Sequence, residues 1–317
     1  MINQDIINKL SVITDEEKSI LSGEGINKDI YMTDDDTVVR HEKLLKNGKL
    51  VAIRPHTRFI DFPSHTHNFV EVVYMCKGST THIINDETIT LKEGEILFLS
   101  TSATQKIKRA TENDIAVNFF INPQFFDKIL EMLGEEETPL KRFVIDALTH
   151  KNTSNHYLYF KVSNVLPIQN LIENLLYTLI SDVTAKRNVI TITMGLLFLE
   201  LINHTDKLYT DKKTDSVLLE VFRYIDENYK SGSLMELAKL LNKDFYFLSK
   251  EIKNLSGKTY TELLQEKRLS QAAFLLKRTY MNISDISIMV GYENISYFHR
   301  IFSKKFGVSP KKYRDCK

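Results

Sequence analysis

Short hydrophobic segments in the first half of the chain predict a β-rich domain. Runs such as FVEVVYMC, ETITL and IAVNFFI are rich in β-branched and aromatic residues, and turn signals such as NDE and KEGE separate them. Regularly spaced short strands of this kind predict a sandwich or a small barrel. We assign the barrel to residues 49–123 and a helical and loop extension to residues 1–48.

The pattern changes to helical spacing after Pro123. Apolar residues recur three and four positions apart from Ile168 to Ile180, and ITMGLLFLELI is apolar most of the way round. Such a helix is expected to be buried, in a core or against a partner helix. We interpret residues 124–202 as a dimerisation and connecting region, and the polar stretch at residues 203–215 as a linker.

An internal repeat fills the C-terminal residues 216–317. SLMELAKLLNKDFYFLSKEIKNLSGKTY and NISDISIMVGYENISYFHRIFSKKFGVSP align with a period of 50 residues at Gly257 and Gly307, and the second copy has one extra residue in its turn. Each copy predicts a short helix, a tight turn and a second helix that ends at its glycine. Between the copies, TELLQEKRLSQAAFLLKR has no helix breaker and predicts one long helix.

Helix-start signals support these boundaries. Ser233 and Thr259 each precede a glutamate by three positions, which is the spacing of a capping box. Asp244 and Asn294 stand where N-caps of the two second helices are expected. The sequence therefore predicts two helix-turn-helix units joined by a rigid helix.

Charge is unevenly distributed along the chain. The formal net charge is +1, but residues 216–317 carry 18 basic and 11 acidic side chains, a net +7, which leaves −6 in the first 215 residues. This division suggests that the C-terminal part alone meets a polyanion, although a solvated basic surface would give the same count. Two helix-turn-helix units about one DNA turn apart, roughly 34–36 Å, could read one face of a duplex. A linking helix of about 17 residues spans about 25 Å, which is compatible with that reach.

The segment ISDISIMVGYENISYFHRIFSKKFGVSPKKYR closely resembles the signature of the AraC/XylS family of transcription regulators. Its Gly-Tyr and Tyr-Phe pairs, its later Phe, Gly and Pro, and its final Tyr-Arg fall at the family's spacing, and the resemblance extends over about 100 residues. It implies that double-stranded DNA is a partner. It places candidate DNA contacts on the second helix of each copy: Tyr246, Phe247, Ser249, Lys250 and Lys253 in the first, and Ile295, Ser296, Tyr297, His299, Arg300 and Lys304 in the second.

These side chains are expected to make different contacts. Arg300 is the candidate for a two-pronged contact to guanine, whereas Lys253 and Lys304 are expected to bind phosphate, which fixes register without reading sequence. Aromatic residues at helical spacing are also typical of a core. We therefore assign five apolar positions of the two helices to the core: Leu248, Ile252, Phe298, Phe302 and Phe306.

A motif with metal-site spacing lies in the β domain. His65, His67 and Glu71 with the following glycine resemble the first motif of the cupin β-barrel, and alternation along one strand would place the three side chains on the same face. Two imidazoles and a carboxylate suit iron, manganese or zinc. However, Gln105 stands where a second motif would supply another histidine, and Ser100 replaces its proline. Because glutamine is a poor ligand, we predict no metal and no cofactor here, but a pocket for a small molecule.

Polar residues of the β domain are the candidates for that pocket. Arg54 and Arg58 precede the histidines and would suit a carboxylate or a hydroxyl-rich ligand, although each could instead pair with a surface acid. Regulators of the family often carry a cupin-like sensing domain, and this precedent weakly favours a sugar. The candidate effector contacts are Arg54, Arg58, His65, His67, Glu71, His82, Gln105 and Asn118.

The leading hypothesis is an α+β transcription regulator, not an enzyme. It has an N-terminal cupin-like barrel with flanking helices and a C-terminal all-α domain of two helix-turn-helix units. Its expected partners are duplex DNA, a small-molecule effector, a second copy in a homodimer, and RNA polymerase. Two cysteines, no signal peptide and no apolar run of roughly 20 residues indicate a cytoplasmic protein without a membrane span. The alternatives are a cupin metalloenzyme with a helical appendage and a regulator whose barrel serves only assembly.

Overall fold

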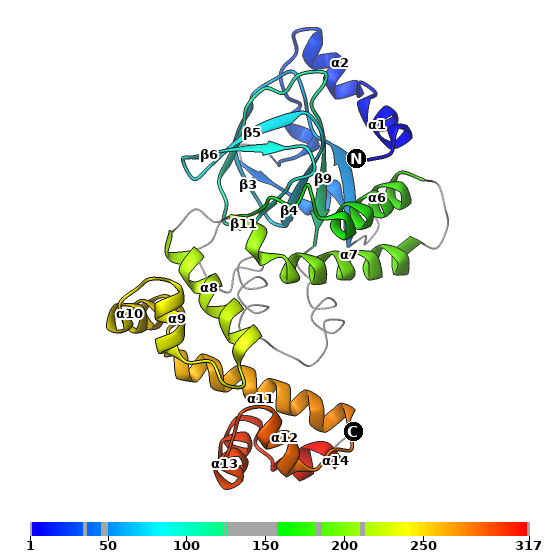
Figure 1. Ribbon diagram of the computed structural model, residues 1–317. Coiled ribbons are helices and arrows are strands. Elements are labelled where there is room, and N and C mark those ends of the chain that lie inside the picture. Colours follow the sequence, from blue (N-terminus) through cyan, green and yellow to red (C-terminus); the bar gives the residue numbers. More distant parts are fainter. Residues whose placement is uncertain are drawn as a thin grey trace. The chain divides into compact units, whose positions relative to one another are not determined.

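The computed structural model describes residues 2–33, 37–45, 50–122, 125, 157–181, 186–209 and 213–315 (Figure 1). The described residues form two compact units, which we call the barrel unit (residues 2–209) and the helical unit (residues 213–315). The α+β class is confirmed, because strands lie in the first unit and the second consists of helices.

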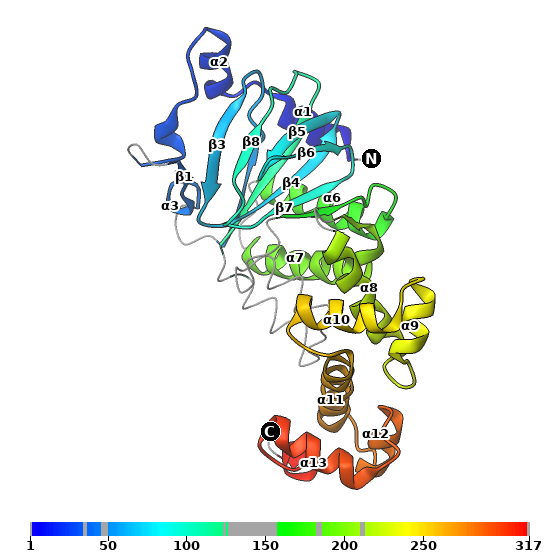
Figure 2. The ribbon, with the colours of Figure 1, turned by 90° about the vertical axis from the view of Figure 1, so that its left-hand side faces the viewer.

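Two facing sheets make the barrel unit, and Figure 2 shows β3, β8 and β5 side by side in one of them. The five-stranded sheet has the order β1 (Val38–Val39), β3 (Phe62–His67), β8 (Gln105–Ile107), β5 (Ser79–Ile84) and β6 (Glu87–Lys92). The six-stranded sheet has the order β11 (Leu208–Tyr209), β10 (Tyr157–Phe160), β7 (Ile96–Leu99), β4 (Val70–Lys77), β9 (Ile115–Ile121) and β2 (Val51–Pro55).

The turns between strands form where the sequence predicts them. Asn85 and Asp86 join β5 to β6 with positive φ values of 46° and 70°, which these two residue types tolerate better than most. Gly78 joins β4 to β5 with φ +81°, and a Cβ there would lie 2.5 Å from Oδ1 of Asp114. That same oxygen accepts a hydrogen bond from the Ser79 amide at 2.9 Å, so the carboxylate needs the space.

The structure corrects two predictions about the strands. The single strand expected to carry His65, His67 and Glu71 is two strands in different sheets, because the chain bends at Asn68 and Phe69. The β region was expected to end near Pro123, yet β10 and β11 extend the six-stranded sheet later in the chain. A strand of four residues and one of two carry too little pattern to be recognised in a helix-rich stretch.

Helices cover the outside of the six-stranded sheet. α6 (Leu166–Ile180) and α7 (Lys186–Asn203) pack against each other, and Phe198 of α7 stacks on Phe98 of β7 at 5.5 Å. Tyr74 of β4 donates a hydrogen bond to Gln169 of α6 at 2.6 Å. The N-terminal extension contains α1 (Gln4–Ser11), α2 (Asp15–Leu21), the 3-10 turn η1 (Lys28–Ile30) and α3 (His41–Leu44), and a second 3-10 turn, η3 (Thr205–Lys207), precedes β11.

Part of the expected dimerisation and connecting region, residues 126–156 and 182–185, lies outside the described residues, as does Cys316. Within the described ranges, no helix is both long and apolar enough to cross a membrane.

The helical unit follows the predicted repeat. Its helices are α8 (Lys213–Asn228), α9 (Leu234–Leu240), α10 (Phe245–Ser256), α11 (Tyr260–Arg278), α12 (Ile283–Met289), α13 (Ile295–Phe306) and α14 (Pro310–Asp315). Ser233 and Thr259 form complete capping boxes, and Asp244 and Asn294 accept hydrogen bonds from the third amides of α10 and α13. Gly257 and Gly307 end the two second helices in the left-handed conformation, at φ +70° and +72°.

The core assignments of the helical unit are confirmed, with one qualification. Leu248, Ile252, Phe298 and Phe302 have no exposed surface. Phe306 is only partly buried, and its ring packs against Phe302 with centroids 4.5 Å apart. The second helices of the two copies, α10 and α13, therefore each have one buried face and one face open to solvent. We call them the recognition helices, after the DNA contacts expected on them.

Candidate functional site

The outward faces of α10 and α13 carry all the candidate DNA contacts. Tyr246 is 79% exposed and Phe247 59%, values that are unusual for large aromatic side chains. Within the part of the chain that the structure describes, four cations on these faces form no ion pair: Lys250, Lys253, Arg300 and Lys304. Ser249 and His299 are half-buried, whereas Ile295, Ser296 and Tyr297 are exposed.

Arg300 lies on the ring of a neighbouring tyrosine. Its guanidinium carbon is 5.3 Å from the centroid of Tyr297, one turn earlier on α13. Tyr297 is itself held, because Gln265 of α11 donates a hydrogen bond to its hydroxyl at 3.2 Å. This arrangement limits the orientations of the guanidinium while leaving its N–H groups in solvent. It also gives Tyr297 a supporting contact that the sequence does not reveal.

In the first copy, the corresponding aromatic residue, Phe247, has different neighbours. Lys243 lies over the ring of Phe247 at 5.3 Å, but its ammonium also pairs with Glu251 at 2.8 Å. That cation is therefore neutralised within the protein. Among the described residues of α10, Lys250 and Lys253 are cations that form no ion pair, and both have long flexible stems.

Polar side chains are buried in the interior of the barrel. His56, His65, His67 and Glu71 are each 3% exposed, and His82 and Gln105 not at all. They come from both sheets, and some of them line a cavity of about 30 Å³ together with Tyr31, Arg54, Asn118 and Phe120. That volume holds roughly one or two water molecules.

A directed hydrogen-bond chain runs through the cavity wall. The Asn118 amide donates to Glu71 at 2.8 Å, so its carbonyl oxygen must accept from Nδ1 of His56 at 2.9 Å. Because burial lowers the pKa of His56, the ring is neutral and its Nε2 is an acceptor. Among the described residues that Nε2 has no partner, and neither do Nδ1 of His67 and Oε1 of Gln105.

A second chain occupies the other part of the interior. Nε2 of Gln105 donates to Nδ1 of His82 at 2.7 Å, so the neutral ring of His82 donates from Nε2 to Thr80 at 2.9 Å. The Thr80 hydroxyl then donates to the sulfur of Met75 at 3.6 Å. His82 and Gln105 therefore support the cavity from behind and do not line it.

Burial changes the protonation of these groups in opposite directions. It raises the pKa of Glu71 to about 7, against the opposing effect of the Asn118 hydrogen bond. It lowers the pKa of His65 to about 4 and holds those of His67 and His82 well below the usual range. The imidazoles are therefore neutral at pH 7, and burial favours the protonated form of Glu71.

The two candidate arginines differ in their surroundings. Arg54 lines the cavity, stacks over Tyr31 at 4.7 Å and pairs with Glu16. Arg58 does not line the cavity. Its guanidinium is fully buried and makes a two-pronged contact to Glu17 at 2.7 and 2.9 Å. Its remaining donors bind the carbonyl oxygens of Ser11, Val12 and Glu112. This geometry gives Arg58 a structural task, joining α2 to the barrel, and its contact to an effector stays a prediction.

Two of the candidate metal ligands contact other protein groups. Nε2 of His67 faces Glu71 at 3.2 Å, and Nδ1 of His65 contacts the carbonyl oxygen of Pro63 at 2.8 Å. The ligand atoms are thus turned toward one another or toward the backbone. Within the described ranges, no group of three His, Cys, Asp or Glu side chains is arranged to hold a metal.

His56 and Tyr31 are among the cavity residues that the sequence analysis did not identify. His56 lies two positions after Arg54, so alternation along that strand could have identified it. Tyr31 comes from the N-terminal extension, where no periodic pattern indicates that a side chain reaches the barrel.

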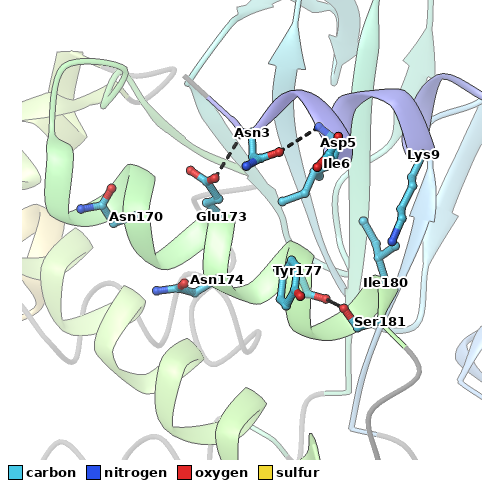
Figure 3. Close-up of a pocket in the computed structure, with 10 residues that line it drawn as sticks. All are labelled: Asn3, Asp5, Ile6, Lys9, Asn170, Glu173, Asn174, Tyr177, Ile180 and Ser181. Carbon is cyan, nitrogen blue, oxygen red and sulfur yellow. Dashed lines mark hydrogen bonds between the residues drawn. The ribbon is translucent and has the colours of Figure 1, made fainter.

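A larger hollow of about 440 Å³ lies outside the barrel, between α1 and α6 (Figure 3). Its lining includes Asn3, Glu173 and Tyr177, and the Asn3 amide donates to Glu173 at 3.2 Å. Because these groups are largely solvated and Tyr177 is 64% exposed, we interpret the hollow as a surface groove.

Known proteins match both units. A family model described as an AraC-like ligand binding domain matches residues 47–135, and one described as a helix-turn-helix domain matches residues 237–315. The transcriptional activator RhaR of Mannheimia succiniciproducens is 25% identical over 289 residues, which cover 89% of this chain and 98% of the relative. RhaS of Escherichia fergusonii is 23% identical, covering 83% and 91%. Among solved structures, the C-terminal domain of AraT, a response regulator from Geobacillus stearothermophilus, is 31% identical over 33% of this chain and 89% of its own, with a TM-score of 0.32.

Proposed function

Because the chain belongs to the AraC family of transcription regulators, we propose that it binds specific duplex DNA through α10 and α13 in response to an effector in the barrel. The observation that carries the first half is the outward face of the two recognition helices. Among the described residues, four cations on this face form no ion pair and several aromatic rings are exposed, while the core positions Leu248, Ile252, Phe298 and Phe302 on the opposite faces are fully buried. A surface of this composition suits phosphate and base contacts.

A selection experiment tests DNA recognition. The full chain is incubated with a random pool of duplexes, and the enriched sequence is then titrated at 50 to 200 mM salt. We expect two half-sites about one helical turn apart and an affinity that falls steeply with salt, because each phosphate contact releases counterions. No enrichment above the starting pool would refute the proposal.

The effector proposed for the barrel is a small, uncharged molecule with several hydroxyl groups, such as a sugar. The unpartnered Nε2 of His56 and the Glu71 carboxylate offer hydrogen-bond acceptors, so a ligand rich in donors would satisfy them. Ligand pockets usually exceed about 300 Å³, ten times the volume of the described cavity. Effector binding would therefore have to open the lining, and this requirement supports a coupling between binding and conformation.

A thermal-shift screen separates this proposal from a barrel that serves only assembly. The full chain is tested against monosaccharides and the matching sugar acids. A bound ligand at 100 times its dissociation constant adds about 2.7 kcal/mol to stability. We expect a neutral sugar to shift the melting temperature and its acid to have no effect, because the acid would face Glu71. Uniformly null shifts would favour assembly alone.

We also propose that α7 contributes to a homodimer. Val189, Ile192 and Leu196 are about half exposed and lie on one side of that helix, at spacings of three and four residues. A second copy could cover this stripe. Light scattering of the full chain and of Ile192→Glu tests it, since a buried glutamate in the contact should give monomers at micromolar concentration, whereas an unchanged mass would contradict it. The domain limits given above and RNA polymerase as a partner remain predictions.

A further inference from the structure

Three segments of the helical unit meet at the side chain of Arg268, near the middle of α11. Its Nε donates to the carbonyl oxygen of Tyr229 at 2.6 Å, and one terminal nitrogen donates to that of Lys230 at 2.9 Å. These carbonyls directly follow the C-terminus of α8. The guanidinium carbon also lies 5.4 Å from the ring centroid of Tyr292, in the turn of the second helix-turn-helix unit.

The same turn makes a backbone contact with the end of α8. Gly291 has φ +92°, and a Cβ there would lie 2.5 Å from the Lys230 oxygen and 2.9 Å from the Arg268 guanidinium carbon. The first copy provides an internal comparison, because Asn242 occupies the equivalent turn position with φ +50°. The turn alone therefore accepts a side chain, and the close approach of α8 is what requires glycine at Gly291.

Helix α8 is also attached to the first helix-turn-helix unit. The Tyr224 hydroxyl donates to Glu236 at 2.9 Å and accepts from the Ser233 amide at 3.2 Å, so it joins the capping box of α9. The body of α8 packs against α10 and α11.

Further along α8, Asp226 pairs with Lys267 of α11 at 3.2 Å, and the Lys267 side chain is only 7% exposed. Tyr229 packs against the core of the second unit. The segment made of α8 and the residues directly after it thus contacts both helix-turn-helix units and α11, which joins them. In Figure 1 the end of α8 reaches α11.

We propose that α8 fixes the angle between the two helix-turn-helix units, and that Arg268 is the positioning residue that holds the end of α8 against α11 and the second turn. The guanidinium suits this task, because it satisfies two carbonyls at a helix C-terminus and at the same time contacts the second turn. In the chain, α8 is the first helix after the barrel unit. A conformational change in the barrel unit that moves α8 would therefore change the positions of both helix-turn-helix units together.

A distance measurement tests the positioning role of Arg268 without DNA. Spin labels are placed at exposed positions of the two recognition helices, with Asn254→Cys on α10 and Lys304→Cys on α13, in the full chain carrying Cys316→Ser. Arg268→Ala should broaden the distribution of label distances at least twofold. Arg278→Ala removes an exposed arginine from the same helix and is the matched control, which should leave the width unchanged.

The conservative variant and a DNA readout complete the test. Arg268→Lys keeps the charge but cannot hold both carbonyls, so it should give an intermediate width, and it carries the test if the alanine variant does not fold. On the selected duplex, one inserted base pair between half-sites should weaken the wild type at least tenfold and Arg268→Ala less than threefold. A width and a spacing preference that are both unchanged in Arg268→Ala would overturn the proposal. A wild type that selects no duplex would count against the proposed function instead, and the label distances would still decide the role of Arg268.

Discussion

The barrel interior and the recognition helices depart from ordinary folding preference in opposite directions. The barrel buries His56, His67, Glu71 and Gln105, and each has a polar atom without a hydrogen-bond partner among the described residues, although such burial costs free energy. The helical unit instead leaves Tyr246 and Phe247 in solvent. The cores of both units are apolar, and several helices of the helical unit have side-chain caps at their N-termini. The difference teaches where to look for function, because a fold tolerates such departures mainly where a ligand or partner compensates them.

The largest expected effect contrasts a residue that follows folding preference with one that does not. Phe298→Ala empties a fully buried site and should lower the free energy of unfolding by about 3–5 kcal/mol. Tyr246→Ala, at a 79% exposed position, should change it by less than about 0.5 kcal/mol while weakening DNA binding. Urea unfolding of the full chain, followed by circular dichroism, measures the first quantity. Equal losses of stability would mean that Tyr246 has a structural role.

The next effect separates the two copies. Arg300→Ala should remove about 1–3 kcal/mol of discrimination at one base pair, because a held guanidinium reads guanine in two places. Lys250→Ala in the first copy should weaken binding to all sequences to a similar extent. Titrating both variants against every single-base change in the selected duplex distinguishes the two outcomes. Unchanged discrimination between base pairs in Arg300→Ala would contradict a base contact by this side chain.

The buried polar groups of the barrel should make the free energy of unfolding depend on pH. The folded pKa of Glu71 is raised to about 7, so this group stabilises the fold more as pH falls from 7 toward the unfolded pKa. The buried histidines have lowered pKa values and act in the opposite sense, so their contribution is lost as pH falls below 6.5. Glu71→Gln removes the first effect, and between pH 7 and 6 it should lose about 1 kcal/mol more stability than the wild type.

Urea unfolding of both proteins at the two pH values provides the measurement. Asp61→Asn is a suitable control, since this exposed carboxyl has a pKa lowered mainly by a hydrogen bond from the Arg109 amide and should not titrate in that range. Parallel pH profiles for the wild type and Glu71→Gln would contradict the assigned burial effect.

The smallest expected effect concerns the phosphate contacts. Lys253→Ala and Lys304→Ala should each reduce the slope of log affinity against log salt by about 0.9, the value for one phosphate, without altering base preference. Arg278→Ala, on an exposed position of α11, serves as the control. A slope unchanged in both lysine variants would place phosphate binding on other residues of the unit.

The sequence predicted the helical unit far better than the barrel. Several helices there have their own start or stop signals, such as Ser233 and Gly257, so local residues define much of the unit. The barrel depends on pairing between distant segments, such as His65 with Gln105 across β3 and β8. The local pattern could suggest that these side chains share the barrel interior. It does not predict the bend at Asn68 and Phe69 that places His67 and Glu71 in different sheets.

Side-chain partners were predicted least well. The spacing of His65, His67 and Glu71 suggested a common face, and they do approach one another. Nothing local indicates that Arg58 is occupied by Glu17, 41 positions away, or that Gln265 supports Tyr297 from a different helix. Such contacts follow from tertiary packing, which a single sequence does not specify.

The contrast between Asn242 and Gly291 has a consequence for how a duplicated segment can diverge. Two copies of one motif begin under the same constraints, but only the second turn touches a third helix. Substitutions should therefore accumulate at Asn242 across related genes, while Gly291 persists even where its neighbours change. If relatives with a bulky residue at Gly291 turn out to be common, they should also have lost the arginine at Arg268 or have altered the end of α8.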